Sequence, residues 1–302
     1  MGLPDFDLQE VDALIRRTGT AFEISSILRS NAKSMVLDGS VEGESAILKI
    51  LLNRGGECER WFANELNFYS MQRTAPVDVT TPRMLAGSRE TGFLLLSRIE
   101  GEPVAKDRLY PRTDITAGVP LFDALQRTRE YTNWSVLHPG ATVPDLLSSC
   151  RSYEEAGFVP KNMMIEPLAL LSSKELPIEF AHGDPVPSNV IRLSDGNVAL
   201  LDWEHCGSRL AGFDLAVVWA MSQGAREYRR HIHRQIQHWG DRELDAFLCN
   251  LLYILGRETK NYRIAQFPGA EKICEQFALT LTELSIALRR GMDKLSALNA
   301  LA

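Results

Sequence analysis

The sequence has few cysteines and no long apolar run, and both absences exclude a class of protein. Its five cysteines are scattered, odd in number and without a C-x-x-C pair, which offers no zinc site and is typical of reduced thiols. No stretch reaches the ~18 apolar residues that a membrane span requires, and the acidic segment 1–15 lacks the apolar core of a signal peptide. We therefore expect a cytoplasmic protein with no membrane partner.

An excess of positive charge is also missing. Lysine and arginine total 33 against 39 aspartates and glutamates, so the formal net charge is −6. A protein that binds nucleic acid by neutralising phosphates usually has the opposite balance, and we expect no nucleic-acid partner. Hydrophobic residues make up 45% of the 302 residues, which is enough for one large domain or two modest ones with buried cores.

The first hundred residues have the pattern of a small sheet with helices beside it. Helical periodicity covers residues 7–18 and a stretch within 57–74. Strands are expected at 22–28, 34–37, 46–52, 83–86 and 93–99. The pair Asp38-Gly39 is typical of a hairpin turn, and Gly101 with Pro103 ends the pattern.

After Pro103 the sequence becomes mainly helical. Helices are expected at 118–133, 144–156, 164–173, 209–222, 225–239, 242–258 and 270–299. One hairpin interrupts them, with strands 190–193 and 198–201 around a Ser-Asp-Gly turn. We therefore expect an α+β protein of two lobes, residues 1–101 and 102–302, joined near 97–101, with a ligand cleft between the lobes.

The segment HGDPVPSN, residues 182–189, carries the most distinctive chemistry. Asp184 and Asn189 share this loop, which two prolines stiffen, and Asp202 follows at the end of the hairpin. One carboxylate can orient a hydroxyl, while an amide oxygen and a second carboxylate can hold Mg²⁺ against nucleotide phosphates. Each residue alone is equally typical of an ordinary turn. The combination predicts magnesium-dependent phosphoryl transfer.

HGDPVPSN together with LLDWE, residues 200–204, closely resembles the motifs of the aminoglycoside phosphotransferase and choline kinase-like family, which has a protein-kinase-like fold. The resemblance implies that Asp184 is the catalytic base and that Asn189 and Asp202 bind Mg²⁺. It also implies that His182 braces the loop rather than reacting. A buried, hydrogen-bonded core histidine would look the same in the sequence.

The same resemblance assigns a nucleotide site to the N-terminal sheet. Lys49, in the strand AILKILL, would hold the α and β phosphates and pair with a glutamate of the next helix. Glu65 matches that glutamate best by position, with Glu57 and Glu59 as alternatives. A lone lysine among apolar residues is costly to bury unless it has such a partner.

Two more positions follow from the resemblance. The backbone of Ser97 and Ile99, in the connector between the lobes, would form hydrogen bonds with the adenine edge. Asp214 begins an apolar helix and is a good N-cap whatever the function. In the family, an aspartate at this place also ties down the catalytic loop.

Two features depart from the pattern or leave it open. The turn LRSNAKSM, residues 28–35, has no glycine, although close approach of backbone to phosphates usually needs one. Ser30 and Asn31 can form the turn and donate hydrogen bonds, so we expect them at the phosphates. The basic segment 225–242 is most simply a solvated helix face, although it could meet an anionic substrate. Glu204 is expected at the cleft wall.

These observations predict a small-molecule kinase, a monomer or homodimer, that uses Mg²⁺ and either ATP or GTP to phosphorylate a hydroxyl. The resemblance favours an antibiotic as acceptor, since many bacterial members inactivate antibiotics. The alternatives are a metabolic kinase for choline, homoserine, thiamine or a sugar, and a non-catalytic nucleotide-binding protein, for which the glycine-free turn is the only argument. The helices that shape the acceptor pocket carry no motif that names the acceptor.

Overall fold

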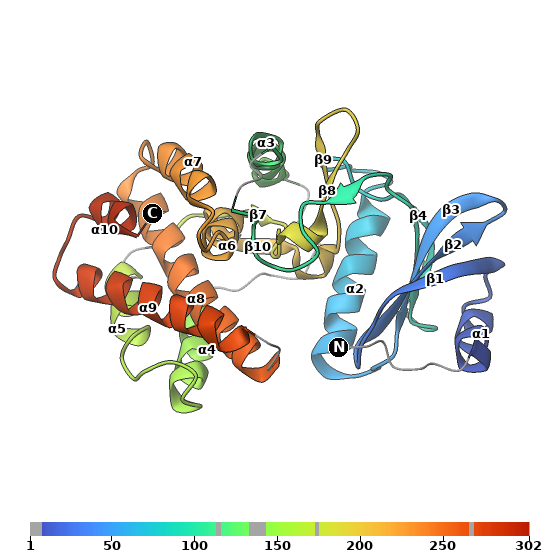
Figure 1. Ribbon diagram of the computed structural model, residues 1–302, viewed down its shortest axis with the longest axis horizontal. Coiled ribbons are helices and arrows are strands. Elements are labelled where there is room, and N and C mark those ends of the chain that lie inside the picture. Colours follow the sequence, from blue (N-terminus) through green and yellow to red (C-terminus); the bar gives the residue numbers. More distant parts are fainter. Residues whose placement is uncertain (1–7, 113–115, 133–142, 173–174, 266–268, 302) are drawn as a thin grey trace.

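The molecule is an antiparallel sheet packed beside a mainly helical part (Figure 1). The computed structural model describes residues 8–112, 116–132, 143–172, 175–265 and 269–301. Across these ranges, no helix combines the length and the apolar character that crossing a membrane requires.

Within the described residues, the N-terminal sheet has five strands in the order β1-β2-β3-β5-β4, and all neighbours are antiparallel. The strands are β1 Phe22–Ser30, β2 Ser34–Val41, β3 Glu44–Leu51, β4 Met84–Ser88 and β5 Phe93–Ser97. Helix α1 (Leu8–Thr18) precedes the sheet, and α2 (Gly56–Met71) stands between the sheet and the helical part (Figure 1). Apolar side chains of β2, β3 and β5 form a core within the sheet region.

The hairpin turn predicted at Asp38-Gly39 is wrong. Both residues lie inside β2, and the chain turns instead at Glu42 and Gly43, whose φ angles are 52° and 81°. Gly39 is needed for a different reason, because a Cβ there would lie 2.1 Å from the carbonyl oxygen of Glu23 on β1. The glycine thus permits close strand approach rather than a turn.

The helical part is organised around two central helices, α6 and α8. Every residue of α6 is buried, and α8 packs against α4, α5, α6 and α9. The helices of this part are α3 Gly118–Arg129, α4 Val143–Glu155, α5 Ile165–Leu171, α6 Phe213–Met221, α7 Arg226–Ile236, α8 Asp241–Ala265, α9 Ala270–Arg289 and α10 Lys294–Ala300. This packed framework supports the loops on which the site is built.

Short strands and 3₁₀ turns lie between the sheet and these helices. Strand β7 (Ile178–Ala181) pairs with β10 (Gly207–Leu210), and β6 (Glu102–Pro103), β8 (Val190–Arg192) and β9 (Val198–Leu200) form a second small sheet. The 3₁₀ turns are η1 (Pro187–Asn189) and η2 (Trp203–His205).

Several predicted helices have different bounds: the helix expected over 118–133 ends at Arg129, and the helix expected over 242–258 continues to Ala265. Two others differ because a glycine separates them from the neighbouring segment. The helix expected over 209–222 begins only at Phe213, because 207–210 is strand β10 and Gly212, at φ 77°, separates the two elements. The helix expected over 270–299 ends at Arg289, and Gly291, at φ 67°, follows it. A new helix then starts where the side chain of Asp293 accepts a hydrogen bond from the Ser296 N–H.

Aromatic stacking joins the sheet region to the small strands. Phe68 of α2 is stacked on Trp203 of η2, with ring centroids 4.0 Å apart and an interplanar angle of 10°. Phe180 of β7 lies parallel to both rings. All three side chains are buried, so α2 and the hairpin that carries Asp202 are held in a defined relation.

Candidate active site

Asp214 holds the loop that follows β7. Its two carboxylate oxygens accept hydrogen bonds from the backbone N–H groups of His182 and Gly183, each at 2.8 Å. Burial raises the pKa of Asp214 to about 7, although these two N–H groups favour the charged form. Gly183 has φ 89°, and a Cβ there would lie 2.2 Å from the carbonyl oxygen of His205. Only glycine fits between His182 and Asp184.

His182 is a bridge within the same loop. Its Nδ1 accepts a hydrogen bond from the Asp184 N–H at 3.2 Å, so Nε2 carries the proton and donates it to the carbonyl of Leu201 at 2.9 Å. The ring is fully buried against Trp203, and this burial lowers the pKa of His182 to about 4. A neutral imidazole that forms a hydrogen bond at each ring nitrogen is suited to positioning Asp184 relative to the hairpin.

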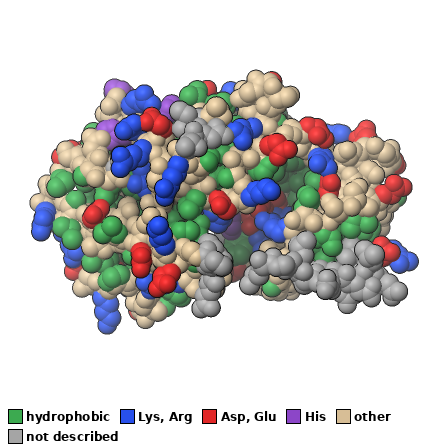
Figure 2. Space-filling view, viewed as in Figure 1, with side chains coloured by type: hydrophobic (Ala, Val, Ile, Leu, Met, Phe, Trp, Pro, Cys, Tyr) green, Lys and Arg blue, Asp and Glu red, His purple; other side chains and the backbone are tan. Residues whose placement is uncertain are grey.

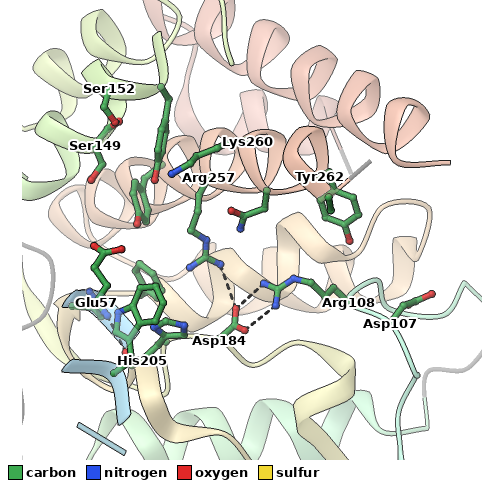
Figure 3. Close-up of a pocket in the computed structure, with 18 residues that line it drawn as sticks. Glu57, Asp107, Arg108, Ser149, Ser152, Asp184, His205, Arg257, Lys260 and Tyr262 are labelled. Atoms are coloured by element: carbon green, nitrogen blue, oxygen red, sulfur yellow. Dashed lines mark hydrogen bonds and ion pairs between the residues drawn. The ribbon is translucent and has the colours of Figure 1, made fainter. Parts of the chain in front are cut away.

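Asp184 lies between two arginines (Figure 3). Arg108 donates to both of its oxygens, at 2.9 and 3.0 Å, and Arg257 of α8 lies 3.4 Å from Oδ1. Burial opposes ionisation of the carboxyl, but the two guanidinium groups hold the pKa of Asp184 well below its usual range. Both arginines also contact Glu258, whose side chain is fully buried.

Asn189 and Asp202 supply oxygen atoms beside this loop. The amide Nδ2 of Asn189 donates to the carbonyl of Asp184 at 3.0 Å, which directs its Oδ1 away from that contact. The Asn189 carbonyl accepts from the Leu201 N–H at 2.9 Å, and Asp202 follows in the left-handed conformation at φ 62°. An amide oxygen and a carboxylate are hard ligands, so this donor set fits Mg²⁺.

Lys49 is the centre of a buried charge cluster. Its Nζ lies 2.6 Å from Glu65 of α2, 2.7 Å from Asp202 and 3.2 Å from Glu204. Burial opposes the charge on Lys49, but these carboxylates raise the lysine pKa well above its usual value. Burial raises the pKa of Glu65 to about 7, against the lowering effect of Lys49.

The alternatives considered for Glu65 lie elsewhere. Glu57 pairs with Arg60, and Glu59 with Arg89, both on the exposed side of α2. Neither contacts Lys49. Glu204, expected at the cleft wall, is instead buried and paired with Lys49 and with Lys33.

The glycine-free turn brings side-chain cations to the charge cluster. Asn31 closes the turn, since its Oδ1 accepts hydrogen bonds from the N–H groups of Lys33 and Ser34, both at 2.9 Å. The hydroxyl of Ser30 is buried and has no partner among the described residues. Arg29 lies 3.6 Å from Asp202, and Lys33 pairs with Glu204. The turn therefore presents ammonium and guanidinium groups where other sites use backbone N–H groups.

A cavity of about 330 Å³ opens under this turn. Lys49, Asn189 and Asp202 line it, together with Ser97 and Ile99 of the connector. The N–H of Ser97 is already donated to the carbonyl of Arg83 at 2.8 Å, so the predicted backbone contact of Ser97 with adenine would use its carbonyl. The N–H of Ile99 has no hydrogen-bond partner within the described ranges. The N–H of Ile99 is therefore the better hydrogen-bond donor for a nucleobase.

A second cavity, of about 740 Å³, opens on the other side of the loop. Asp184 lies at its floor, with Arg108 and Arg257 over the carboxylate and Lys260 above them (Figure 3). In the space-filling view, a hollow separates the sheet region from the helical part, and Lys or Arg side chains are visible inside it (Figure 2). The two cavities thus lie on opposite sides of the loop 182–189. Asp184 lines the larger cavity, and Asn189 lines the smaller one together with Asp202 of the hairpin.

The model of the phosphotransferase enzyme family (APH) matches residues 26–247. This span contains both motifs and the whole charge cluster. The chain belongs to the phosphotransferase enzyme family.

Solved structures share the phosphotransferase fold at low sequence identity. A thermostable mutant of the aminoglycoside phosphotransferase APH(4)-Ia, in ternary complex with ADP and hygromycin B, is 13% identical, with 88% of this chain and 97% of that chain covered and a TM-score of 0.62. The macrolide 2'-phosphotransferase MphH from Brachybacterium faecium is 12% identical, with 89% and 97% covered and a TM-score of 0.60.

Choline kinase LicA from Streptococcus pneumoniae is 13% identical, with 94% of this chain and 100% of that chain covered and a TM-score of 0.61. No curated protein matches the sequence significantly. The predicted protein-kinase-like fold is confirmed, and the chain is a phosphotransferase that uses a hydroxyl acceptor. Neighbours that act on an aminoglycoside, a macrolide and choline leave its own acceptor to be argued from the site.

Sequence reasoning missed the cations of this phosphotransferase site. Arg108 lies in the irregular segment after Pro103, and Arg257 lies in a stretch that showed only helical periodicity. Arg29 and Lys33 belong to the turn whose lack of glycine is its most visible feature in the sequence. A search of that turn for basic residues would have found the second pair, whereas nothing local distinguishes the first.

Proposed function

We propose that this phosphotransferase moves the γ-phosphoryl group of ATP or GTP to a hydroxyl of a small molecule. The observation that carries the proposal is the single loop that presents Asp184 to one cavity and Asn189, with Asp202 of the hairpin, to the other. Donor and acceptor would meet across this loop. In-line transfer needs that arrangement, with little covalent chemistry left for the protein.

Asp184 would orient the acceptor hydroxyl and take its proton. The acceptor oxygen forms a bond to the γ phosphorus, the bond from that phosphorus to the β–γ bridging oxygen breaks, and the nucleoside diphosphate leaves. Asn189 and Asp202 would hold Mg²⁺, which supplies neutralising charge to the phosphates when it is bound.

Lys49 would bind the α and β phosphates while Glu65 positions its ammonium group. The nucleotide would draw Lys49 away from Asp202 and Glu204, which it contacts now. Arg29 and Lys33 would turn from the same two carboxylates onto the phosphates. This exchange of partners keeps each cation paired before and after the nucleotide enters.

Two acceptor classes are supported. The aminoglycoside and macrolide phosphotransferases among the structural neighbours favour an antibiotic, which the protein would inactivate. The choline kinase among them favours a metabolite instead, although the arginines at Asp184 disfavour a cationic metabolite such as choline. A polycation would meet repulsion from those arginines, so within the antibiotic class an aminoglycoside is the weaker candidate.

The test is phosphoryl transfer from ATP or GTP, with Mg²⁺, to a panel of antibiotics and hydroxyl metabolites. Asp184→Asn should lower kcat/KM by about 10²–10⁴-fold and leave nucleotide affinity unchanged, because a general base acts on the acceptor. Asp78→Asn, on a 92% exposed side chain, is the matched control. Near-normal turnover in Asp184→Asn would show that the base is another group. Nucleotide binding with no transfer to any acceptor would favour the non-catalytic alternative.

A further inference from the structure

The 740 Å³ cavity beside Asp184 is cationic in its interior. Among the lining residues that the structure describes, the cations are Arg108, Arg209, Arg257 and Lys260, and the acids are Glu57, Asp107 and Asp184. Glu57 is 67% exposed and pairs with Arg60 outside the cavity, and Asp107 is also exposed. Figure 3 shows both acids at the edge of the group, away from the arginines. Of these three acids that line the cavity, Asp184 is therefore the one that faces the interior cations.

Two of these cations lack a carboxylate partner within the described part of the chain. Lys260 lies over the ring of Tyr153, with Nζ 5.3 Å from the centroid, and makes no ion pair there. Arg209 donates to the carbonyl of His205, and its Nε is buried without a hydrogen-bond partner. A buried donor left without an acceptor is costly unless a ligand supplies one.

The other two cations share acids with each other. Arg108 and Arg257 both contact Asp184 and both contact the fully buried Glu258. The Nε of Arg108 is also buried without a partner. The pair thus retains an unused N–H donor at Arg108 Nε. Both arginines contact Asp184, the carboxylate proposed as the base.

We propose that the acceptor is a hydroxyl compound bearing a carboxylate or phosphate group, and that Lys260, Arg257 and Arg108 bind this anionic group. The inference rests on the proposed function and names its substrate class. An acceptor anion would draw Arg108 from Asp184 and leave the carboxylate free to take the hydroxyl proton. A neutral or cationic acceptor has no group to make that exchange.

The experiment measures equilibrium binding of matched pairs by calorimetry, with Mg²⁺ and the non-hydrolysable nucleotide AMP-PNP saturating the donor site. The pairs are gluconate with glucose and glycerol 1-phosphate with glycerol, and kanamycin is the polycation. At least one anionic member should bind more than about tenfold tighter than its neutral partner, as charge-assisted hydrogen bonds predict. The two pairs distinguish a carboxylate from a phosphate. Equal binding within both pairs, or tighter binding of kanamycin, overturns the proposal.

Lys260→Gln is the decisive variant, because it removes a cation that has no structural ion pair. It should weaken binding of the anionic probe by about tenfold and leave the neutral probe unchanged. Lys272→Gln, which removes an exposed lysine of α9, should change neither. An unchanged affinity in Lys260→Gln would overturn the assignment of the anion site.

Failure of this inference and failure of the proposed function give different results. If AMP-PNP does not bind and ATP with Mg²⁺ is not turned over with any acceptor, the proposed function is overturned. If the nucleotide binds and a neutral or cationic acceptor is phosphorylated best, the proposed function stands and only the inference of an anionic acceptor is overturned.

Discussion

Arg108 and Asp184 form a two-pronged ion pair, with nitrogen-to-oxygen distances of 2.9 and 3.0 Å, although 76 residues separate them in the sequence. The pair joins the segment after β6 to the loop that follows β7. It keeps Asp184 charged and, for the same reason, a weak proton acceptor. In this structure the proposed base is therefore restrained by Arg108.

Removing Arg108 should change the pH profile. Arg108→Gln takes away the closest positive charge, so the pKa of Asp184 should rise toward its usual value and the acid limb of kcat/KM should move up by about 1–3 pH units. Arg83→Gln, at a 72% exposed side chain, is the control and should leave the profile unchanged. An acid limb that stays in place would mean that Asp184 does not titrate in the rate-limiting step.

The glycine-free turn should bind phosphates through its side chains. Arg29→Ala and Lys33→Ala should each raise the KM for ATP by about three- to tenfold with a smaller change in kcat, because each removes one charge-assisted contact. The effect should shrink at high salt, and more for Arg29, whose side chain is 47% exposed, than for Lys33, whose side chain is 19% exposed. Arg60→Ala, on the exposed face of α2, should behave as the wild type. If the KM for ATP is unaffected, these cations serve only to neutralise Asp202 and Glu204.

Metal dependence should follow Asn189 and Asp202. Chelation of Mg²⁺ with EDTA should abolish transfer, and Asn189→Ala should raise the Mg²⁺ concentration for half-maximal rate by about tenfold or more, because one oxygen ligand is lost. Asn197→Ala, in the exposed turn between β8 and β9, is the matched control. A shift of equal size in the control would mean that the hairpin, and not the ligand, had been disturbed.

His182 should make stability depend on pH. Its pKa is about 4 in the folded protein against 6.5 ordinarily, so the unfolded chain binds the extra proton first as the pH falls. The contribution of His182 to the free energy of unfolding should therefore be maintained above pH 6.5 and fall by about 3 kcal/mol as the pH falls through 4. Denaturant melts across this range should show a smaller loss in His182→Asn.

His238→Asn, on an exposed side chain, is the control for that series and should keep the wild-type slope. His205, whose pKa burial also lowers, is present in every variant, so only the difference between variants is assigned to His182. A His182→Asn protein with the full wild-type slope would mean that His182 is not the group that titrates.

Much of the fold and of the site was predictable because the information is local. The alternation of apolar residues in the N-terminal strands and the periodicity of α2 and α8 follow from burial of one face of each element. The pairing of Lys49 with a glutamate of the next helix was implied by the family resemblance, and burial of a lone lysine requires such a partner without choosing between Glu65, Glu57 and Glu59. The bounds of α6 were missed because strand pairing of 207–210 with β7 outweighed helical periodicity there.

The sequence by itself determined the phosphotransferase motifs, because Asp184, Asn189 and Asp202 occupy one loop and one hairpin, and their short spacing places them together. Only the tertiary structure decided which charges surround them. Arg108 and Arg257 reach Asp184 across 76 and 73 residues, and Arg29 and Lys33 reach Asp202 and Glu204 from the opposite part of the molecule. Charges separated so far in sequence meet only through packing of whole elements, so no local pattern records the cationic character of the cavity beside Asp184.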